Sequence, residues 1–407
     1  MLAKFSEEFR FLLSACFDTL IAPPSTSFNW GELQRLAARH RVEGLVGETV
    51  SALPLGSVPT ETAASFSKAK RALGFAYLSQ LGETLRLSNL LQSVGIASIA
   101  LKGAALANVY YAPHPERRHA IDIDILVDPA DFASADRLLR REGYHRISPD
   151  FAPPEAAESM VRHLLNAFEY CHSERGIKVE LHHRLLSNPY ILVIPFPDLL
   201  KDSVEVRIGQ GSVRALGGNA LIAYLSAHAA GHAFFRLKWL ADIHRVVLSL
   251  TPEEIYDALA EAGRWGCDGP LVLSLLLEEK FGGSGGRTLE PKLQSHVEPL
   301  VGHCIRALLR PEHRGEHALR DLPSDLHTAF YGSQLGNNWR SQLFPLLRLL
   351  AHSDDTRVLK LGVEWSVLYA VLGRPLAAYR LLRRRFLKPS AEPIDSAFLE
   401  LHKTKKQ

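Results

Sequence analysis

Two aspartates at strand-like spacing are the residues that most clearly could do chemistry. The run Ile121-Asp122-Ile123-Asp124-Ile125 alternates carboxylates with β-branched side chains. This period of two predicts a strand with Asp122 and Asp124 on one face. Two carboxylates about 7 Å apart on one face repel each other, and a divalent cation bound between them removes that repulsion. The pair therefore predicts a metal site; two exposed aspartates on a solvated edge strand are the alternative.

A third carboxylate lies in a second alternating run. Ile177-Lys178-Val179-Glu180-Leu181-His182 predicts another strand, with Lys178, Glu180 and His182 on one face. Glu180 either joins the metal site or forms an exposed pair with Lys178. His182 could orient Glu180 or contact a substrate, and a histidine satisfied at a strand end is the alternative.

Lys102 and Gly103 stand between a short apolar run at residues 95–101 and an apolar helical stretch. A glycine at a strand-to-helix turn lets backbone N–H groups approach phosphates, whose charge Lys102 or Arg118 could neutralise. A salt bridge at the helix start is the alternative for Lys102, and a solvated basic loop is the alternative for Arg118.

His228, His232 and Arg236 are spaced four residues apart, and Trp239 and Asp242 follow on the same broad helical face. These polar residues interrupt an apolar stripe that should face inward. Three interpretations stay open. In the first, the polar residues form a wall of a substrate or nucleotide site. In the second, they form a hydrogen-bonded structural cluster, such as His232 with Asp242. In the third, His228 and His232 bind zinc. The zinc site would lack the glutamate of the metalloprotease helix.

Helices and strands alternate around these residues. Helical spacing of apolar residues covers positions 5–53 and 61–93, and the chain reads mainly as helix from position 219 onward. Between these parts we expect strands at 95–101, 121–127 and 177–183, and helices at 104–111 and 131–142, the second ended by Gly143. A further helix is expected after the proline-rich loop at 148–154.

Composition bounds the protein class. The 407 residues are 46% hydrophobic and 22% charged, as expected for a globular chain with a large core, and the net charge of +3 gives no reason to expect nucleic acid as a partner. Four scattered cysteines without a C-x-x-C pair argue against a disulfide framework or a structural zinc site. Because no signal peptide or transmembrane run is found, we expect a cytoplasmic location.

A basic run lies near the end of the chain. Six positive charges without an acid fall in fifteen residues, namely Arg374, Arg380, Arg383, Arg384, Arg385 and Lys388. A solvated helix end is the default interpretation. Docking to an acidic partner, to a membrane surface or to RNA is the alternative.

Several of these motifs together resemble one known family. Leu101-Lys102-Gly103, Arg118, the strand at 122–127, Gly143-Tyr144 and Val179-Glu180-Leu181-His182 look like the uncharacterised nucleotidyltransferase family of the polymerase-beta-type superfamily. The similarity extends over most of the chain, to Trp30, His40-Arg41-Val42, His228-x-x-x-His232, Trp239, Asp242, Leu368-Tyr369 and Arg374-Pro375. Ala104 and Glu180 stand where the wider superfamily commonly has Gly or Ser and Asp, respectively.

The resemblance implies an α+β, mainly helical fold. A small mixed β-sheet core at residues 94–215 would lie between an N-terminal helical segment, 1–93, and a C-terminal helical domain, 216–390, with a flexible tail at 391–407. Asp122 and Asp124 would bind Mg²⁺ bridging the phosphates of a nucleoside triphosphate (NTP) such as ATP, and Glu180 would complete the site of a second Mg²⁺. Lys102, Gly103, Arg118, His182, His228, His232, Arg236 and Asp242 are expected to contribute to nucleotide binding.

The expected reaction is transfer of a nucleoside monophosphate from an NTP to a hydroxyl or similar group, with release of pyrophosphate. The acceptor could be a small molecule, a peptide or a protein. A catalytically weak or inactive module that binds a nucleotide or partner is the second hypothesis. A metal-dependent hydrolase using His228 and His232 is the third.

Overall fold

A computed structural model describes residues 5–19, 24–54, 56–282, 289, 291–310, 322–373 and 375–376. The basic run beginning at Arg374 and the expected tail at 391–407 lie outside the described residues. Among the described residues, no helix is long and apolar enough to cross a membrane.

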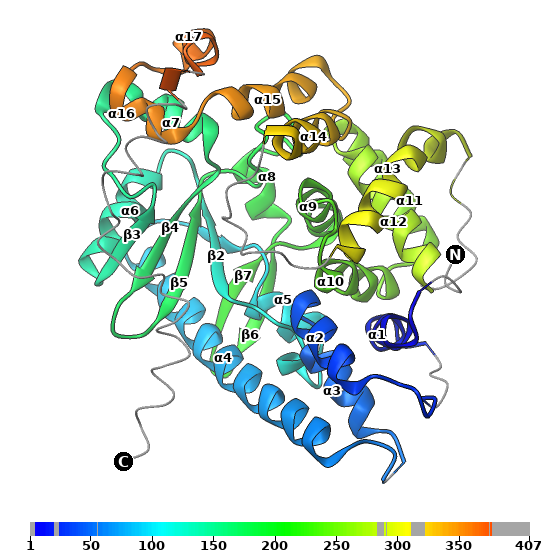
Figure 1. Ribbon diagram of the computed structural model, residues 1–407. Coiled ribbons are helices and arrows are strands. Elements are labelled where there is room, and N and C mark those ends of the chain that lie inside the picture. Colours follow the sequence, from blue (N-terminus) through cyan, green and yellow to red (C-terminus); the bar gives the residue numbers. More distant parts are fainter. Residues whose placement is uncertain are drawn as a thin grey trace.

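A mixed seven-stranded sheet forms the centre of the α/β part, in the order β3-β4-β5-β2-β1-β7-β6 (Figure 1). Parallel pairing joins β2 to β5 and β1 to β7, and the other neighbours are antiparallel. This arrangement confirms the predicted α+β, mainly helical fold. The strands are β1 (Ser98–Ala100), β2 (Asp122–Val127), β3 (Tyr144–Ser148), β4 (Ala167–His172), β5 (Ile177–His182), β6 (Val204–Ile208) and β7 (Gly211–Ala215).

One face of the sheet is buried under helices α4 (Thr60–Ser93) and α6 (Phe132–Arg141). The β-branched residues of the alternating run, Ile123 and Ile125, lie in this core with Leu87 of α4 and Phe132 of α6. Because strand side chains alternate between faces, Asp122 and Asp124 must lie on the opposite face. Leu126, which shares that face, belongs to the core of the helical half.

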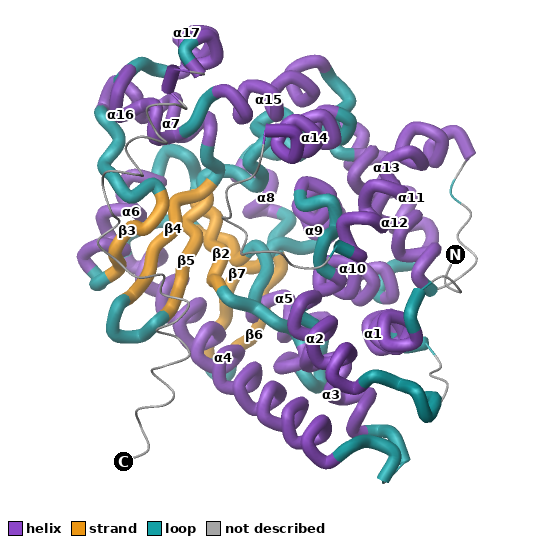
Figure 2. Tube along the Cα trace, viewed as in Figure 1, coloured by secondary structure: helices purple, strands orange, loops and turns teal. Residues whose placement is uncertain are grey.

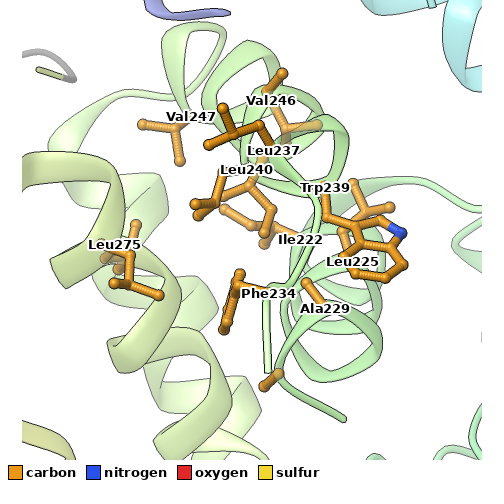
Figure 3. Close-up of a cluster of buried hydrophobic side chains, with 14 of the residues drawn as sticks. Ile222, Leu225, Ala229, Phe234, Leu237, Trp239, Leu240, Val246, Val247 and Leu275 are labelled. Atoms are coloured by element: carbon orange, nitrogen blue, oxygen red, sulfur yellow. The ribbon is translucent and has the colours of Figure 1, made fainter. Parts of the chain in front are cut away.

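The helical half combines segments from both ends of the chain. The N-terminal helices share one hydrophobic core with α9, α10 and α12 (Figure 2). Figure 3 shows part of this core, where Phe234, Leu237 and Leu240 meet Ile222 of α9 and Leu275 of α12. The helices are α1 (Glu7–Phe17), α2 (Trp30–His40), α3 (Glu43–Ser51), α9 (Gly218–Gly231), α10 (Leu237–Leu248), α11 (Pro252–Arg264), α12 (Asp268–Phe281), α13 (Pro291–Leu309), α14 (Leu322–Ser333) and α15 (Trp339–Leu350).

Short helices complete the described fold, namely α5 (Ala104–Tyr110), α7 (Glu158–Leu164), α8 (Phe196–Lys201), α16 (Thr356–Leu359) and α17 (Ser366–Val371). The helix expected after the proline-rich loop is therefore present as α7. The domain boundaries stay a prediction, since the residues before 94 and after 215 contribute to one core.

The expected continuous helical face from His228 through Arg236 to Asp242 is wrong. Helix α9 ends at Gly231 and α10 begins at Leu237. Between them Ala233 and Phe234 have φ of 50° and 51°, in the left-handed region, so the chain turns sharply. His228 and Arg236 therefore lie on different sides of a helix–turn–helix junction.

Candidate active site

The pairing of β2 with β5 brings the three carboxylates together. In this parallel register Asp124 lies directly beside Glu180, and Asp122 lies beside Lys178 on the same face. Asp124 is fully buried, whereas the side chains of Asp122 and Glu180 keep about a third of their exposure. Like charges directly opposite each other on a sheet are unfavourable, so this arrangement needs compensating cations.

Lys102 supplies the first of these cations. Its Nζ lies 2.5 Å from Asp124 Oδ1 and 3.8 Å from Asp122 Oδ1. Burial alone would lower the pKa of the Lys102 ammonium, but Asp122 and Asp124 raise it well above its ordinary value. Burial alone would raise the pKa of the Asp124 carboxyl, but Lys102 and then His182 hold it well below its usual range. Both groups of the ion pair are therefore charged.

Gly103 shapes the turn that places Lys102 there. Its φ of 72° and ψ of −136° belong to a region that residues with a Cβ avoid. The strand β1 can thus turn directly into α5.

His182 is the second cation. Its Nε2 lies 3.3 Å from Asp124 Oδ1 and 3.3 Å from Glu180 Oε2. Burial opposes the charged imidazolium, yet these two hydrogen bonds raise the pKa of His182 to about 9. The imidazolium therefore keeps its proton at neutral pH and donates hydrogen bonds to the carboxylates.

The site still offers oxygen atoms to a metal ion. Asp124 Oδ2 is buried and accepts no hydrogen bond from any described residue. Burial raises the pKa of the Glu180 carboxyl to about 7, and Asp124 and Asp122 add to the effect. Within the described part of the chain, one group of three candidate ligands has its donor atoms within 4.8 Å of one another, namely Asp124, Glu180 and His182. An unpaired buried acceptor beside a second carboxylate fits a hard divalent cation.

Arg118 and Asp242 bind each other. Arg118 Nε and Nη2 donate to Asp242 Oδ1 and Oδ2, both at 2.8 Å, and Tyr111 donates to Oδ1 at 2.7 Å. Arg118 Nη1 also donates to the Gly103 carbonyl at 3.2 Å. This buried bidentate pair fastens the Gly103 turn to α10. A part for either residue in nucleotide binding stays a prediction.

The two histidines form an aromatic cluster with Trp239. The His232 ring stacks on Trp239 with centroids 5.0 Å apart, and the His228 ring lies 5.0 Å from His232 and 5.8 Å from Trp239. Burial lowers the pKa of His228 well below its ordinary value, and the neighbouring His232 adds to this effect. Neither histidine belongs to a three-ligand group among the described residues, so the zinc site gains no support. Arg236 is buried with its guanidinium 5.2 Å from the Phe235 ring.

Lys238 was missed by sequence reasoning. It is the second residue of α10, lines the same cleft as Asp122, and has its ammonium 5.9 Å from the Trp239 ring. Burial lowers the pKa of Lys238 to about 8, although Asp122 opposes this shift. A lysine within the apolar run Leu237-Lys238-Trp239-Leu240 is the signal that could have identified it.

A cleft of about 1000 Å³ unites these groups. Lys102, Gly103, Asp122, Glu180, His182 and Lys238 line it, as do Arg118, His228 and His232. Asp242 and Arg236 are not among its lining residues. A cleft of this volume is large enough for a nucleotide together with a second small molecule.

Comparison with known proteins adds the family. No curated protein and no solved structure matches the chain. The model of the uncharacterised nucleotidyltransferase family matches residues 26–283. This range holds every candidate site residue named above and more than half of the chain, and it ends before α14 and α15. The chain therefore belongs to the uncharacterised nucleotidyltransferase family.

Proposed function

We propose that the protein transfers a nucleoside monophosphate from an NTP to a hydroxyl or similar group of an acceptor, with Mg²⁺ as the metal and pyrophosphate as the leaving group. The observation that carries this proposal is the buried, unpaired Oδ2 of Asp124 beside Glu180 on one face of the sheet. Membership of a nucleotidyltransferase family supports the reaction class.

Asp122, Asp124 and Glu180 would hold the metal. All three offer carboxylate oxygens, which hard Mg²⁺ prefers to nitrogen or sulfur ligands. When bound, Mg²⁺ would neutralise charge on the transferred phosphoryl group and activate the acceptor oxygen.

Cationic side chains of the protein keep the buried carboxylate ionised and would also bind the phosphates. Lys102 and His182 lower the pKa of Asp124, so this buried carboxylate is ionised before a metal arrives. Lys238 lines the cleft as a further ammonium, and Asp122 favours its charged form. Lys102 and Lys238 would then bind the phosphates of the NTP as point charges.

The aromatic cluster would bind the base. His232 is exposed, stacks on Trp239 and lines the cleft together with Lys238. Nucleobases stack on aromatic faces with little dependence on base identity. His228, kept neutral by burial, would support the His232 ring from behind rather than ligate a metal.

The reaction can be tested without knowing the acceptor. The purified protein is incubated with each α-labelled NTP, Mg²⁺ and a cell extract, and labelled product and pyrophosphate are measured. We expect both, and we expect neither from the variant carrying Asp122→Asn and Asp124→Asn. Equal activity of that variant, or no pyrophosphate release with any NTP, contradicts the proposal.

The same assay separates the alternative functions. A nucleotide-binding module would bind Mg²⁺ and NTP and release no pyrophosphate. A hydrolase using His228 and His232 would hold zinc tightly after purification, whereas the proposed transferase would hold Mg²⁺ weakly.

A further inference from the structure

The cleft continues past the carboxylates into an apolar half. Leu185 and Ile191 line it from the segment after β5, and Leu335, Phe344 and Leu349 line it from the region of α14 and α15. The first four of these side chains are buried and Leu349 is half-buried. The wall formed by the region of α14 and α15 lies outside the family match, which ends at residue 283.

The apolar half adjoins the Glu180 side of the site. Strand β5 runs from Ile177 to His182 and leads directly into the segment that carries Leu185 and Ile191. Lys102 and Gly103 enter from the other side of β2, because β1 and β5 flank β2 on opposite edges. A molecule in the apolar half would therefore approach the carboxylates past Glu180.

The walls of this half are held in place by contacts between them. Asn188 Nδ2 donates to the Ser341 carbonyl at 2.9 Å, which ties the segment after β5 to α15. The Tyr190 and Phe344 rings pack edge to face, with centroids 6.1 Å apart. The Asn188 Oδ1 accepts from the Tyr190 N–H, so this amide is already satisfied. The subsite is thus preformed, and its apolar wall has a polar margin, because Ser187, Asn188, Arg348 and His352 line the cleft beside these apolar side chains.

A nucleobase fits the part of the cleft around His232 and Trp239 better than it fits the apolar half. Bases bind by stacking on flat aromatic faces, and the exposed His232 ring on Trp239 offers one beside Lys238. The Phe344 ring is instead packed edge to face against His163 as well as Tyr190. Leucine and isoleucine side chains suit an aliphatic body.

We propose that the apolar half is the acceptor subsite, and that the acceptor is a hydroxyl-bearing molecule with an aliphatic body. This inference rests on the proposed nucleotidyl transfer. The acceptor hydroxyl oxygen forms a bond to the α-phosphorus, the bond from that phosphorus to the oxygen bridging the β-phosphate breaks, pyrophosphate leaves with the electron pair, and the hydroxyl proton passes to solvent.

The test uses n-alkanols from ethanol to n-octanol as acceptors, with α-labelled ATP and Mg²⁺. Each added methylene should raise kcat/KM for alkyl phosphodiester formation about three- to fourfold until the subsite is filled. Saturation-transfer NMR of n-octanol on the same protein measures binding without turnover. No increase of kcat/KM with chain length in a protein that consumes ATP overturns the inference.

Two substitutions on α15 give a matched comparison. Leu349→Asp places a carboxylate in the apolar wall and should weaken octanol binding and transfer by about tenfold or more, because the charge must be desolvated. Leu346→Asp lies one turn earlier, at a side chain that is 40% exposed and does not line the cleft. It should retain the wild-type values, and equal effects of the two substitutions also overturn the inference.

The outcomes separate this inference from the proposed function. Octanol binding that Leu349→Asp removes, together with no pyrophosphate release from any NTP, would support an apolar subsite and defeat the transferase proposal. Mg²⁺-dependent ATP cleavage to AMP and pyrophosphate, together with no binding or transfer of octanol, would support the transferase and defeat the aliphatic acceptor.

Discussion

At the scale of residues, the chemistry depends on one buried carboxylate with two cationic neighbours. Asp124 is in contact with Lys102 and His182 through the same oxygen, Oδ1, and keeps Oδ2 unpaired. The period-two pattern predicted which carboxylates share a face, and the β2–β5 register places them together. The pattern could not predict the Arg118–Asp242 pair, because this pair depends on packing between segments more than a hundred residues apart.

Lys102→Met should lower the free energy of unfolding by about 3 kcal/mol, because it leaves the buried Asp124 carboxylate without its nearest cation. Millimolar Mg²⁺ should restore part of the loss, since a cation at Asp124 replaces the missing ammonium. Urea unfolding with and without Mg²⁺ measures both effects. Lys238→Met removes a lysine whose charge is disfavoured by burial and serves as the control with near wild-type stability. Wild-type stability of Lys102→Met, or no response to Mg²⁺, would contradict this account.

Lys238→Met should weaken binding of a non-hydrolysable ATP analogue with Mg²⁺ by about tenfold, the loss of one charge-assisted contact. With a pKa of about 8, Lys238 is cationic below that pH and neutral above it. Affinity of the wild-type protein should therefore fall as pH rises past about 8, and the variant should lack this fall. Calorimetric titrations at pH 7 and pH 9 compare the two proteins. An identical pH dependence in both argues against phosphate binding by Lys238.

At the scale of elements, the turn after β1 is fastened to α10 through a buried ion pair. Arg118 contacts both the Gly103 carbonyl and Asp242. The sequence predicted β2, β5, α5 and α6 from the spacing of their apolar residues and from residues typical of the ends of strands and helices. It could also have predicted the β6–β7 hairpin, where two alternating runs flank Gly209-Gln210. The break between α9 and α10 was missed because the four-residue spacing of His228, His232 and Arg236 imitates one helix.

Asp242→Asn should destabilise the fold by about 3–5 kcal/mol, because the buried Arg118 guanidinium loses its charged partner. The double variant Arg118→Met with Asp242→Asn should lose less than the sum of the two single substitutions, since neither charge is then left buried alone. Denaturant unfolding of the four proteins forms the double-mutant cycle. Additive losses would show that the two side chains do not act as a pair.

At the scale of the whole molecule, the N-terminal helices and helices α9 to α12 share one hydrophobic core. His40 at the end of α2 is fully buried and its Nδ1 accepts a hydrogen bond from the Leu237 N–H at the start of α10. Helical periodicity predicted α2 and the later helices separately. It could not predict that they pack on each other, because periodicity identifies an apolar face without identifying its partner.

This contact predicts a loss of stability in acid. Burial lowers the pKa of His40 to about 3, below the value of about 6.5 expected in the unfolded chain. The unfolded state therefore binds more protons between these values, so the stabilising effect is complete above pH 6.5 and is lost as pH falls toward 3. At pH 5 the loss should be about 2 kcal/mol. His40→Phe should be less stable at pH 8 but lose less between pH 8 and pH 5. Parallel losses in both proteins would contradict this assignment.

The most direct test of the central claim is the rate of pyrophosphate release from α-labelled NTP by the wild-type protein and by Asp124→Asn, each measured with a cell extract as the source of acceptor and corrected for release by the extract alone. The substitution keeps the size of the side chain and removes the carboxylate whose free oxygen would bind Mg²⁺. We predict release by the wild-type protein only when Mg²⁺ is present, and none by Asp124→Asn. Release that continues in the variant or in excess chelator would contradict the account.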